Sequence, residues 1–213
     1  MLSVTERKFI QDGISQNIRN DGRQRNDYRG VSIDQGLIPQ ASGSARVRVG
    51  RTDVLVGVKV EIGTPLPEHP RLGRVEFAVD FSTAATPAGA ARAYEDIASD
   101  LTQALTQTLG GGPSGTGAAV DLEKLGLIEG RTCWVLHVDG LVLVSDGNVL
   151  DALGFAVKAA LEDTRIPRVT VIGGTNEDDL ADFEVDEDTS SALHLDMDRI
   201  PVIVTMNQVQ TLT

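Results

Sequence analysis

The sequence has little cysteine and no long apolar segment. Its single cysteine, Cys133, has no partner in the chain for an internal disulfide, which favours a reducing compartment. No run of about 18 apolar residues could cross a bilayer, and the opening MLSVTERKF lacks the apolar centre of a secretory signal. We therefore expect an intracellular protein without membrane contact. Among the apolar neighbours of a strand, Cys133 should behave as a small buried hydrophobe.

The chain also lacks the overall basic charge that nucleic-acid binding normally requires, since its formal net charge is −12. The charge is unevenly distributed, however. Residues 1–51 hold nine Lys and Arg against five acids, a net +4, while the remainder carries −16. This arginine-rich part could contact RNA or a protein partner, or it could be a solvated basic arm. Both interpretations stay open at this point.

Apolar residues alternate with polar ones over two segments, which predicts strands with one face on a core. The first, residues 43–64, is interrupted by Gly50-Arg51-Thr52-Asp53 and therefore predicts a hairpin. The second is residues 74–81. Residues 132–147 predict two further strands or one long bent strand. The segments RVTVIG (168–173) and PVIVTM (201–206) predict the last two strands.

Helical spacing of apolar residues predicts three helices. The first covers residues 4–20 and starts near Thr5 and Lys8. The second covers 90–109 and should present one apolar stripe. The third covers 148–163 and is apolar on nearly every side, so it should be buried. The stripe of the second helix consists of Ala93, Ile97, Leu101, Leu105 and Leu109.

Two segments look like loops that could be mistaken for sites. Residues 110–117, GGGPSGTG, lack the Gly-Lys-Ser/Thr ending of a phosphate loop and are interpreted as a connector. Residues 177–188 are densely acidic, but they lack the alternating ligands of a calcium loop. A solvated loop is favoured over a metal site. His137, among apolar strand residues, is expected to be a core or interface histidine.

Four segments, taken together, resemble RNase PH-type subunits, and in particular the non-catalytic ring subunits of the exosome. They are DGRQRNDYR (21–29), GSARVRVGRTDVLVGVKVEIGT (43–64), the segment 82–105 and the segment 121–171. The resemblance implies an α+β, RNase PH-like fold (ribosomal protein S5 domain 2-like) with mixed sheets and packed helices.

The same resemblance suggests a division of the chain into four parts. An N-terminal helix and arginine-rich arm would cover 1–30, the RNase PH-like core 31–172, an acidic loop region 173–199, and the start of a C-terminal RNase PH-like part 200–213. Because members of this family usually continue beyond a strand such as IPVIVTM, we expect the C-terminal part to be shortened.

Catalytic members of the family use phosphate to release nucleoside diphosphates from an RNA 3′ end. Their phosphate site is a Gly-Gly turn, followed by small hydroxyl or basic residues, at a helix start. In this chain a carboxylate, Asp151, follows the predicted N-cap Asn148 by three residues and would compete with phosphate. We interpret Gly147, Asn148 and Asp151 as degenerate phosphate-site positions.

The resemblance therefore implies no catalytic residue, no metal and no cofactor. Family aspartates lie just before a strand such as PVIVT, where they could protonate the leaving oxygen. Asp186, Asp188, Asp196 and Asp198 are all in that region, and spacing does not single one out.

Three arginines are candidates for RNA binding: Arg92, Arg46 and Arg48. Arg92 matches the arginine of a family loop, of which this chain keeps only Pro87 and Arg92 within residues 87–92. Arg92 could equally be a surface arginine that caps nothing or pairs with Glu95 or Asp96.

We expect a non-catalytic structural and RNA-channel subunit of the exosome ring that supports 3′–5′ RNA processing and degradation, including rRNA processing and mRNA turnover. The implied partners are other RNase PH-like ring subunits, RNA-binding cap subunits and single-stranded RNA in the assembled channel. The implied location is nucleus, nucleolus and cytoplasm. One alternative is a phosphorolytic 3′–5′ exoribonuclease active alone or with a partner subunit. A second is a solitary RNase PH-like interaction module, which the weakened loop 87–92 favours.

Overall fold

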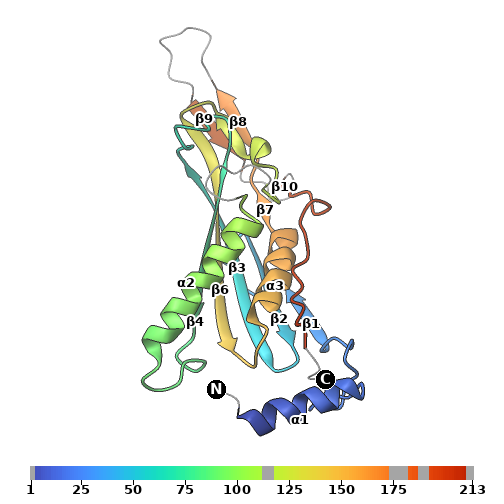
Figure 1. Cartoon of the computed structure of the whole chain (residues 1–213). Helices are drawn as coiled ribbons and strands as arrows, with labels where there is room; N and C mark the ends of the chain where they lie inside the picture. Colours follow the sequence, from blue (N-terminus) through green and yellow to red (C-terminus); the bar gives the residue numbers. More distant parts are fainter. Residues whose placement is uncertain (1–2, 112–117, 173–181, 187–191, 210–213) are drawn as a thin grey trace. The chain divides into compact units, whose positions relative to one another are not determined.

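The computed structural model describes residues 3–111, 118–172, 182–186 and 192–209 (Figure 1). The chain divides into two units, residues 31–203 and residues 1–30 with 204–213. Within the described ranges, no helix is long and apolar enough to span a membrane. The predicted connector 110–117 lies largely outside these ranges, and so does most of the acidic run 177–188.

The smaller unit contains α1 (Val4–Ser15), which is shorter than the predicted helix 4–20. It starts with a capping box: the Ser3 amide donates to Glu6 Oε2, and the Glu6 amide donates to Ser3 Oγ. These bonds also hold the pKa of Glu6 below its usual value. The helix ends early because Asn17 adopts a left-handed conformation, and the Ile18 amide then donates to the Gly13 carbonyl.

The larger unit is built on a six-stranded mixed sheet with the order β1-β2-β3-β6-β4, in which β5 pairs with β6. Only β4 runs parallel to its neighbour β6, and the other pairs are antiparallel. The strands are β1 (Val31–Gln35), β2 (Gly43–Val49), β3 (Thr52–Gly63), β4 (Arg74–Phe81), β5 (Gly126–Ile128) and β6 (Thr132–Val144). The predicted hairpin and the predicted strand 74–81 are confirmed. Within the segment 132–147, residues 132–144 form one long strand, and the last three residues belong to the turn before α3.

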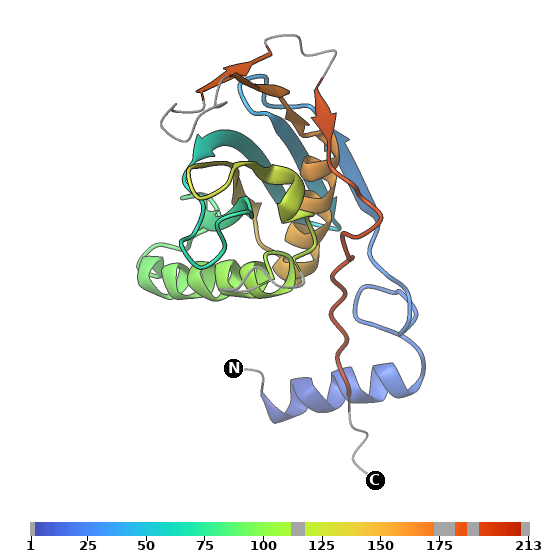
Figure 2. The ribbon, with the colours of Figure 1, turned by 90° about the horizontal axis from the view of Figure 1, so that it is seen from above.

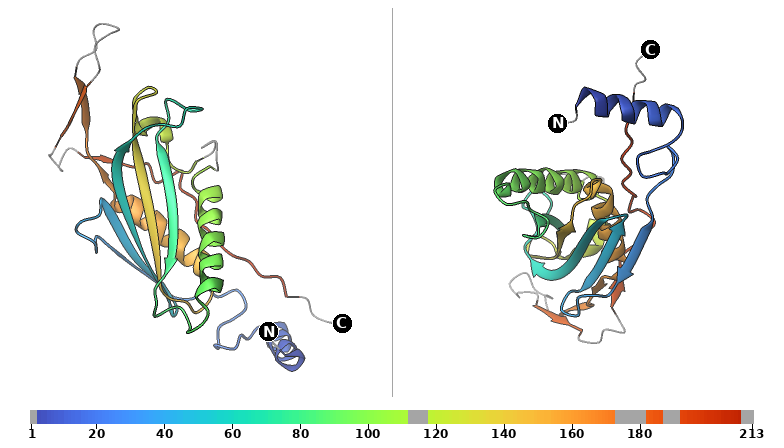
Figure 3. Two further views of the ribbon diagram at one scale, coloured as in Figure 1. Left: turned by 90° about the vertical axis from the view of Figure 1, so that its left-hand side faces the viewer. Right: turned by 90° about the horizontal axis from the view of Figure 1, so that it is seen from below.

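Both long helices, α2 (Ala91–Thr108) and α3 (Val149–Asp163), lie on the same face of this sheet (Figures 2 and 3). A short 3-10 helix, η1 (Leu122–Leu125), also contributes to the core. Helix α3 is buried along most of its surface, as predicted, and Gly154 allows close approach of Ile203 on its far side. The predicted mixed α+β fold is confirmed.

The apolar stripe predicted for α2 is wrong in its first half. Ile97 is 44% exposed and Ala93 is also exposed, whereas Ala98, Leu105 and Leu109 are buried. The reason is helical geometry: a spacing of four residues advances about 40° beyond a full turn, so the stripe drifts off the contact face. The residues that face the sheet instead follow mixed spacings of three and four.

The strand predicted at 201–206 does not form, although the nearby strand prediction at 168–173 is confirmed as β8 (Val169–Ile172), which pairs with β9 (Asp182–Val185). Alternation predicts extended backbone, but a strand also requires a neighbouring strand. Within the described ranges, none pairs with residues 201–206. The remaining strands are β7 (Arg165–Ile166) and β10 (Leu193–His194), which pair with each other.

Two side chains of β6 face the side of the sheet away from the helices. Cys133 is fully buried, as predicted, and burial raises the pKa of its thiol. His137 is not a core residue, because its position in the strand alternates with the core residues Leu136 and Val138. It lies between two carboxylates, those of Glu61 and Glu76. The alternative of an interface histidine stays a prediction.

Candidate phosphate and RNA site

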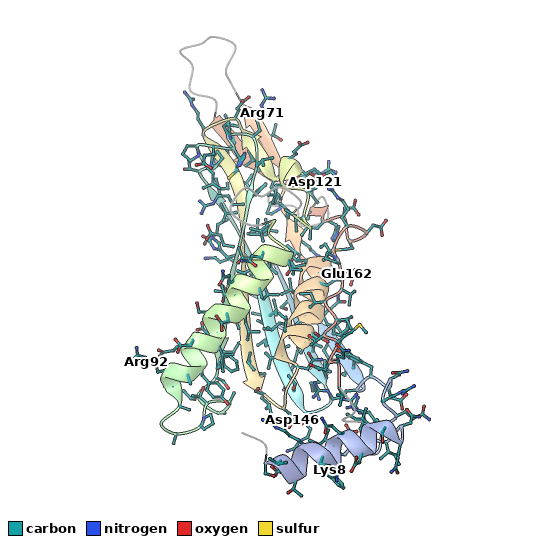
Figure 4. All side chains as sticks on the ribbon, in the orientation of Figure 1. Lys8, Arg71, Arg92, Asp121, Asp146 and Glu162 are labelled. Carbon is teal, nitrogen blue, oxygen red and sulfur yellow. The ribbon has the colours of Figure 1, made fainter. Side chains whose placement is uncertain are left out.

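One end of the sheet in the larger unit collects the predicted phosphate and RNA residues. Because β4 and β6 are parallel and each is followed by a helix, α2 and α3 both begin at this end. Figure 4 shows Arg92 and Asp146 there. The β2–β3 hairpin reaches the same end, since Asp53 on β3 faces Val144 at the end of β6.

The turn before α3 is held by the hairpin through Thr52, which is fully buried. Its hydroxyl donates to the Gly147 carbonyl at 2.7 Å and accepts from the Asp146 amide at 3.1 Å. Gly147 and Asn148 both adopt positive φ, at 82° and 59°. One hydroxyl from a neighbouring strand therefore fixes the path of the chain into the helix.

The first turn of α3 is closed by its own side chains. Asn148 is the N-cap residue, as predicted, and its side-chain amide donates to Asp151 Oδ2 at 2.8 Å. Asp151 is fully buried. A carboxylate in this position is stabilised by the positive end of the helix dipole, and it occupies the place where an external anion would gain the same stabilisation.

The first turn of α2 differs in its charge. Neither Ala90, its N-cap residue, nor Asn148 of α3 makes a side-chain capping bond, but the first turn of α2 contains no acidic residue. Arg92 is exposed there and, in the described part of the chain, has no hydrogen bond or ion pair, so the predicted pairing with Glu95 or Asp96 is absent. Unbonded amides and a guanidinium without a partner can both attract a phosphate.

Arg46 and Arg48 lie on β2, on the sheet face away from the helices. Arg46 makes a two-pronged ion pair with Asp53, with its Nε and Nη2 at 2.9 and 2.7 Å from the two carboxylate oxygens. This hydrogen bonding and the carboxylate charge raise the pKa of Arg46. Arg48 lies 3.4 Å from Asp34. Both arginines would have to leave or share a carboxylate to bind RNA.

The candidate acids lie away from the start of α3. The carbonyl of Ile200 accepts from Lys158 Nζ in the second half of the helix, whereas Ile203 lies beside Gly154, nearer the start. The chain therefore leads from Ile200 back to Asp198 and Asp196 in the direction away from the first turn. The Asp186 amide donates to the Arg168 carbonyl, after the helix has ended. Asp188 lies outside the described residues. Among those described, no three His, Cys, Asp or Glu side chains gather as a metal site would require.

Comparisons of the sequence with known proteins give one family model and relatives that are named as exosome proteins. Residues 27–167 match the family model RNase_PH, described as 3′ exoribonuclease family, domain 1. The chain is 33% identical to a Dictyostelium discoideum protein named "Putative exosome complex exonuclease RRP42", over 98% of this chain and 76% of that protein. It is 36% identical to the exosome complex component Rrp42 of Methanothermobacter thermautotrophicus, over 79% of this chain.

Solved structures with a similar fold come from archaeal exosomes. A chain of the Archaeoglobus fulgidus exosome with RNA bound to the active site is 32% identical, with a TM-score of 0.62 over 76% of this chain and 62% of that chain. A chain of an archaeal exosome core is 27% identical, with a TM-score of 0.59 over 85% of this chain and 73% of that chain. The sequence match with the Methanothermobacter Rrp42, reported above, spans 60% of the length of that protein.

Proposed function

This chain belongs to the RNase PH family of 3′ exoribonucleases, and from that premise we propose that it is a non-catalytic ring subunit of the RNA exosome. In this role it supports 3′–5′ RNA processing and degradation by positioning RNA and neighbouring subunits. The exosome components among its relatives and structural neighbours support the assignment to the ring.

The closed first turn of α3 carries the non-catalytic part of the proposal. Phosphorolysis requires a site for inorganic phosphate next to the last phosphodiester of the RNA. In this chain Asp151 is buried in the helix start and already accepts from Asn148, while Thr52 holds the preceding turn. A phosphate would have to displace a buried carboxylate of the same charge sign, which opposes its binding.

Partners follow from the same proposal. The chain would pair with other RNase PH-like subunits, carry RNA-binding cap subunits, and line part of a channel for single-stranded RNA. The nucleus, nucleolus and cytoplasm would be its locations. Arg92, at the uncapped start of α2, is the best-placed of the three arginines for RNA, because Arg46 and Arg48 each face a carboxylate.

The test is a phosphorolysis assay with single-stranded RNA, inorganic phosphate and magnesium. The purified chain should release no nucleoside diphosphate, while an active RNase PH enzyme serves as the positive control. A parallel gel-filtration experiment with related ring subunits should show a joint complex. Release of diphosphate that is lost in Asp186→Asn or Asp188→Asn would contradict the non-catalytic assignment. A protein that stays apart from such subunits would support the solitary module.

A second candidate, a phosphorolytic site completed with a partner subunit, is favoured by one observation. Arg92 is exposed at a helix start and has no partner among the described residues, so it could bind RNA for a site on a neighbouring chain. The same assay distinguishes this role: activity should then appear only in the mixture with the partner, and it should fall in Arg92→Glu.

A further inference from the structure

The loop that leads from β4 into α2 is tied to β6 by one serine. Ser82 is the first residue after β4, and its amide donates to the Val142 carbonyl at 2.9 Å. Its hydroxyl donates to the Leu143 carbonyl at 3.2 Å and accepts from the Ala85 amide at 3.2 Å. Because a serine hydroxyl can donate and accept at the same time, this side chain joins the loop to the end of the neighbouring strand.

The carbonyl of Ser82 holds the next part of the loop. It accepts from the Ala85 amide at 3.0 Å and from Thr86 Oγ1 at 3.1 Å, which closes a first turn. A second turn follows directly, in which the Ala90 amide donates to the Pro87 carbonyl at 3.0 Å. The ring of Pro87 fixes its own φ, so the two turns are joined by a stiff residue. The loop is therefore a series of bonded turns that begins at Ser82.

The first turn of α2 is held at a second place by an aromatic contact. The ring of Tyr94 meets the ring of Phe81 edge to face, with ring centroids 5.0 Å apart and ring planes at 89°. Phe81 is the last residue of β4 and directly precedes Ser82. Arg92 lies between the second bonded turn and Tyr94, so the backbone is held on both sides of it.

Arg92 itself has no such support. In the described part of the chain its guanidinium has neither a hydrogen bond nor an ion pair, so no side chain fixes its direction. The place from which it can reach a phosphate is therefore set by the backbone at the start of α2. That backbone is held through Ser82 and through the contact of Phe81 with Tyr94, and all of these residues belong to the larger unit.

We infer that Ser82 is a positioning residue for Arg92, because it holds the loop in the conformation from which Arg92 binds an RNA phosphate. The inference rests on the proposed contact between Arg92 and RNA, and it names a residue on which that contact depends. Without the Ser82 hydroxyl, the loop would have to become ordered when RNA binds, and ordering a segment on binding lowers the affinity. Ser82 acts through Arg92 and does not touch the RNA itself.

The first test follows the loop in the purified chain by amide hydrogen exchange and mass spectrometry. Ser82→Ala should speed the exchange of amides between residues 83 and 94 by about threefold or more, because the turns lose their side-chain bond to β6. Thr83→Val is the matched control, since Thr83 is exposed in the same loop and its hydroxyl makes no bond within the described residues. It should exchange like the wild type. Circular dichroism of each variant checks that the fold is retained.

The second test measures RNA affinity in the assembled ring, by fluorescence anisotropy with a labelled single-stranded RNA. Ser82→Ala should lower the affinity by about threefold to tenfold, and Thr83→Val should leave it unchanged. In a chain that already carries Arg92→Ala, Ser82→Ala should have no further effect, because the group that it positions is gone. A serine that only stabilised the fold would lower the affinity equally in both backgrounds.

A second variant makes both tests independent of how well Ser82→Ala folds. Thr86→Val keeps the shape of the side chain and removes its bond to the Ser82 carbonyl, so it loosens the same turn. It should speed exchange in the loop and lower RNA affinity by about twofold each. Its effect on affinity should also disappear in the Arg92→Ala background.

Three results would overturn the inference and leave the RNA contact of Arg92 in place. The first is exchange in Ser82→Ala and Thr86→Val that matches the wild type. The second is an RNA affinity that falls in Arg92→Ala but stays at the wild-type value in Ser82→Ala. The third is a loss of affinity in Ser82→Ala that persists at full size in the Arg92→Ala background. A fourth result, an Arg92→Ala ring that binds RNA like the wild type, would remove both the inference and the proposed contact.

Discussion

The two helices on the sheet begin at the same end, but their first turns are built in opposite ways. The start of α3 is fixed by three side chains: Thr52 holds the turn, and Asn148 donates to the buried Asp151. Neither N-cap residue makes a side-chain capping bond, but the start of α2 has no acid in its first turn and carries an exposed arginine.

This difference shows where an anion could bind on the larger unit. A helix start attracts anions through unbonded amides and its dipole, and an internal carboxylate cancels that attraction. The start of α3 carries such a carboxylate and the start of α2 does not. If the chain contacts RNA at this end of the sheet, we expect the phosphate to lie near Arg92 rather than near Gly147 and Asn148.

The largest effect is expected from removing the carboxylate that closes α3. Asp151→Ala should lower the free energy of unfolding by about 2–3 kcal/mol, because the half-buried Asn148 amide loses this acceptor, the buried site loses its side chain, and the helix start loses a favourable charge. Urea denaturation measures this change. Asp96→Ala, at an exposed position on α2, is the control and should stay within about 0.5 kcal/mol of the wild type. Equal effects in the two variants would show that the two helix starts are not different.

A smaller effect is expected from the hairpin that holds the turn. Thr52→Val keeps the side-chain shape but removes the bonds to the Gly147 carbonyl and the Asp146 amide, so stability should fall by about 1–2 kcal/mol. The matched control is Thr108→Val, because that exposed hydroxyl, within the described part of the chain, bonds only to the Ala104 carbonyl of its own helix. If both valine variants unfold at the same urea concentration, the hairpin does not hold the turn.

The sequence predicts one half of this site and misses the other for a physical reason. Asn148 and Asp151 are three residues apart, so helix-start patterns are enough to place them together. Thr52 lies 95 residues from Gly147 in the sequence, and within the polar stretch Gly50-Arg51-Thr52-Asp53 it looks like an ordinary turn residue. Only the pairing of β3 with β6 brings it to the start of α3.

The same distinction applies to the fold: elements that depend on local residue spacing could be predicted, and those that depend on a strand distant in the sequence could not. Strand 74–81 and the buried helix α3 were predictable because their apolar spacing records which face is covered. The segment 201–206 has the spacing of a strand, but a strand exists only when another strand pairs with it, and spacing does not report that neighbour.

The smallest expected effect on stability, and the most direct test of the open helix start, comes from Arg92. Arg92→Glu should leave the fold intact and could stabilise α2 by up to about 1 kcal/mol, since it adds an acid to an uncapped first turn. In the assembled ring, however, the same change should weaken binding to all RNA sequences alike and lower the slope of log affinity against log salt by about one unit.

The control for Arg92 is Arg71→Glu. Arg71 is also exposed, but it is paired with Glu129 and lies at the opposite end of the larger unit (Figure 4). Its replacement should leave both RNA affinity and the salt slope unchanged. Fluorescence anisotropy with a labelled single-stranded RNA at several salt concentrations measures both quantities. If Arg92→Glu binds RNA like the wild type, the open start of α2 is not part of the RNA path and Arg92 is a surface residue of a scaffold subunit.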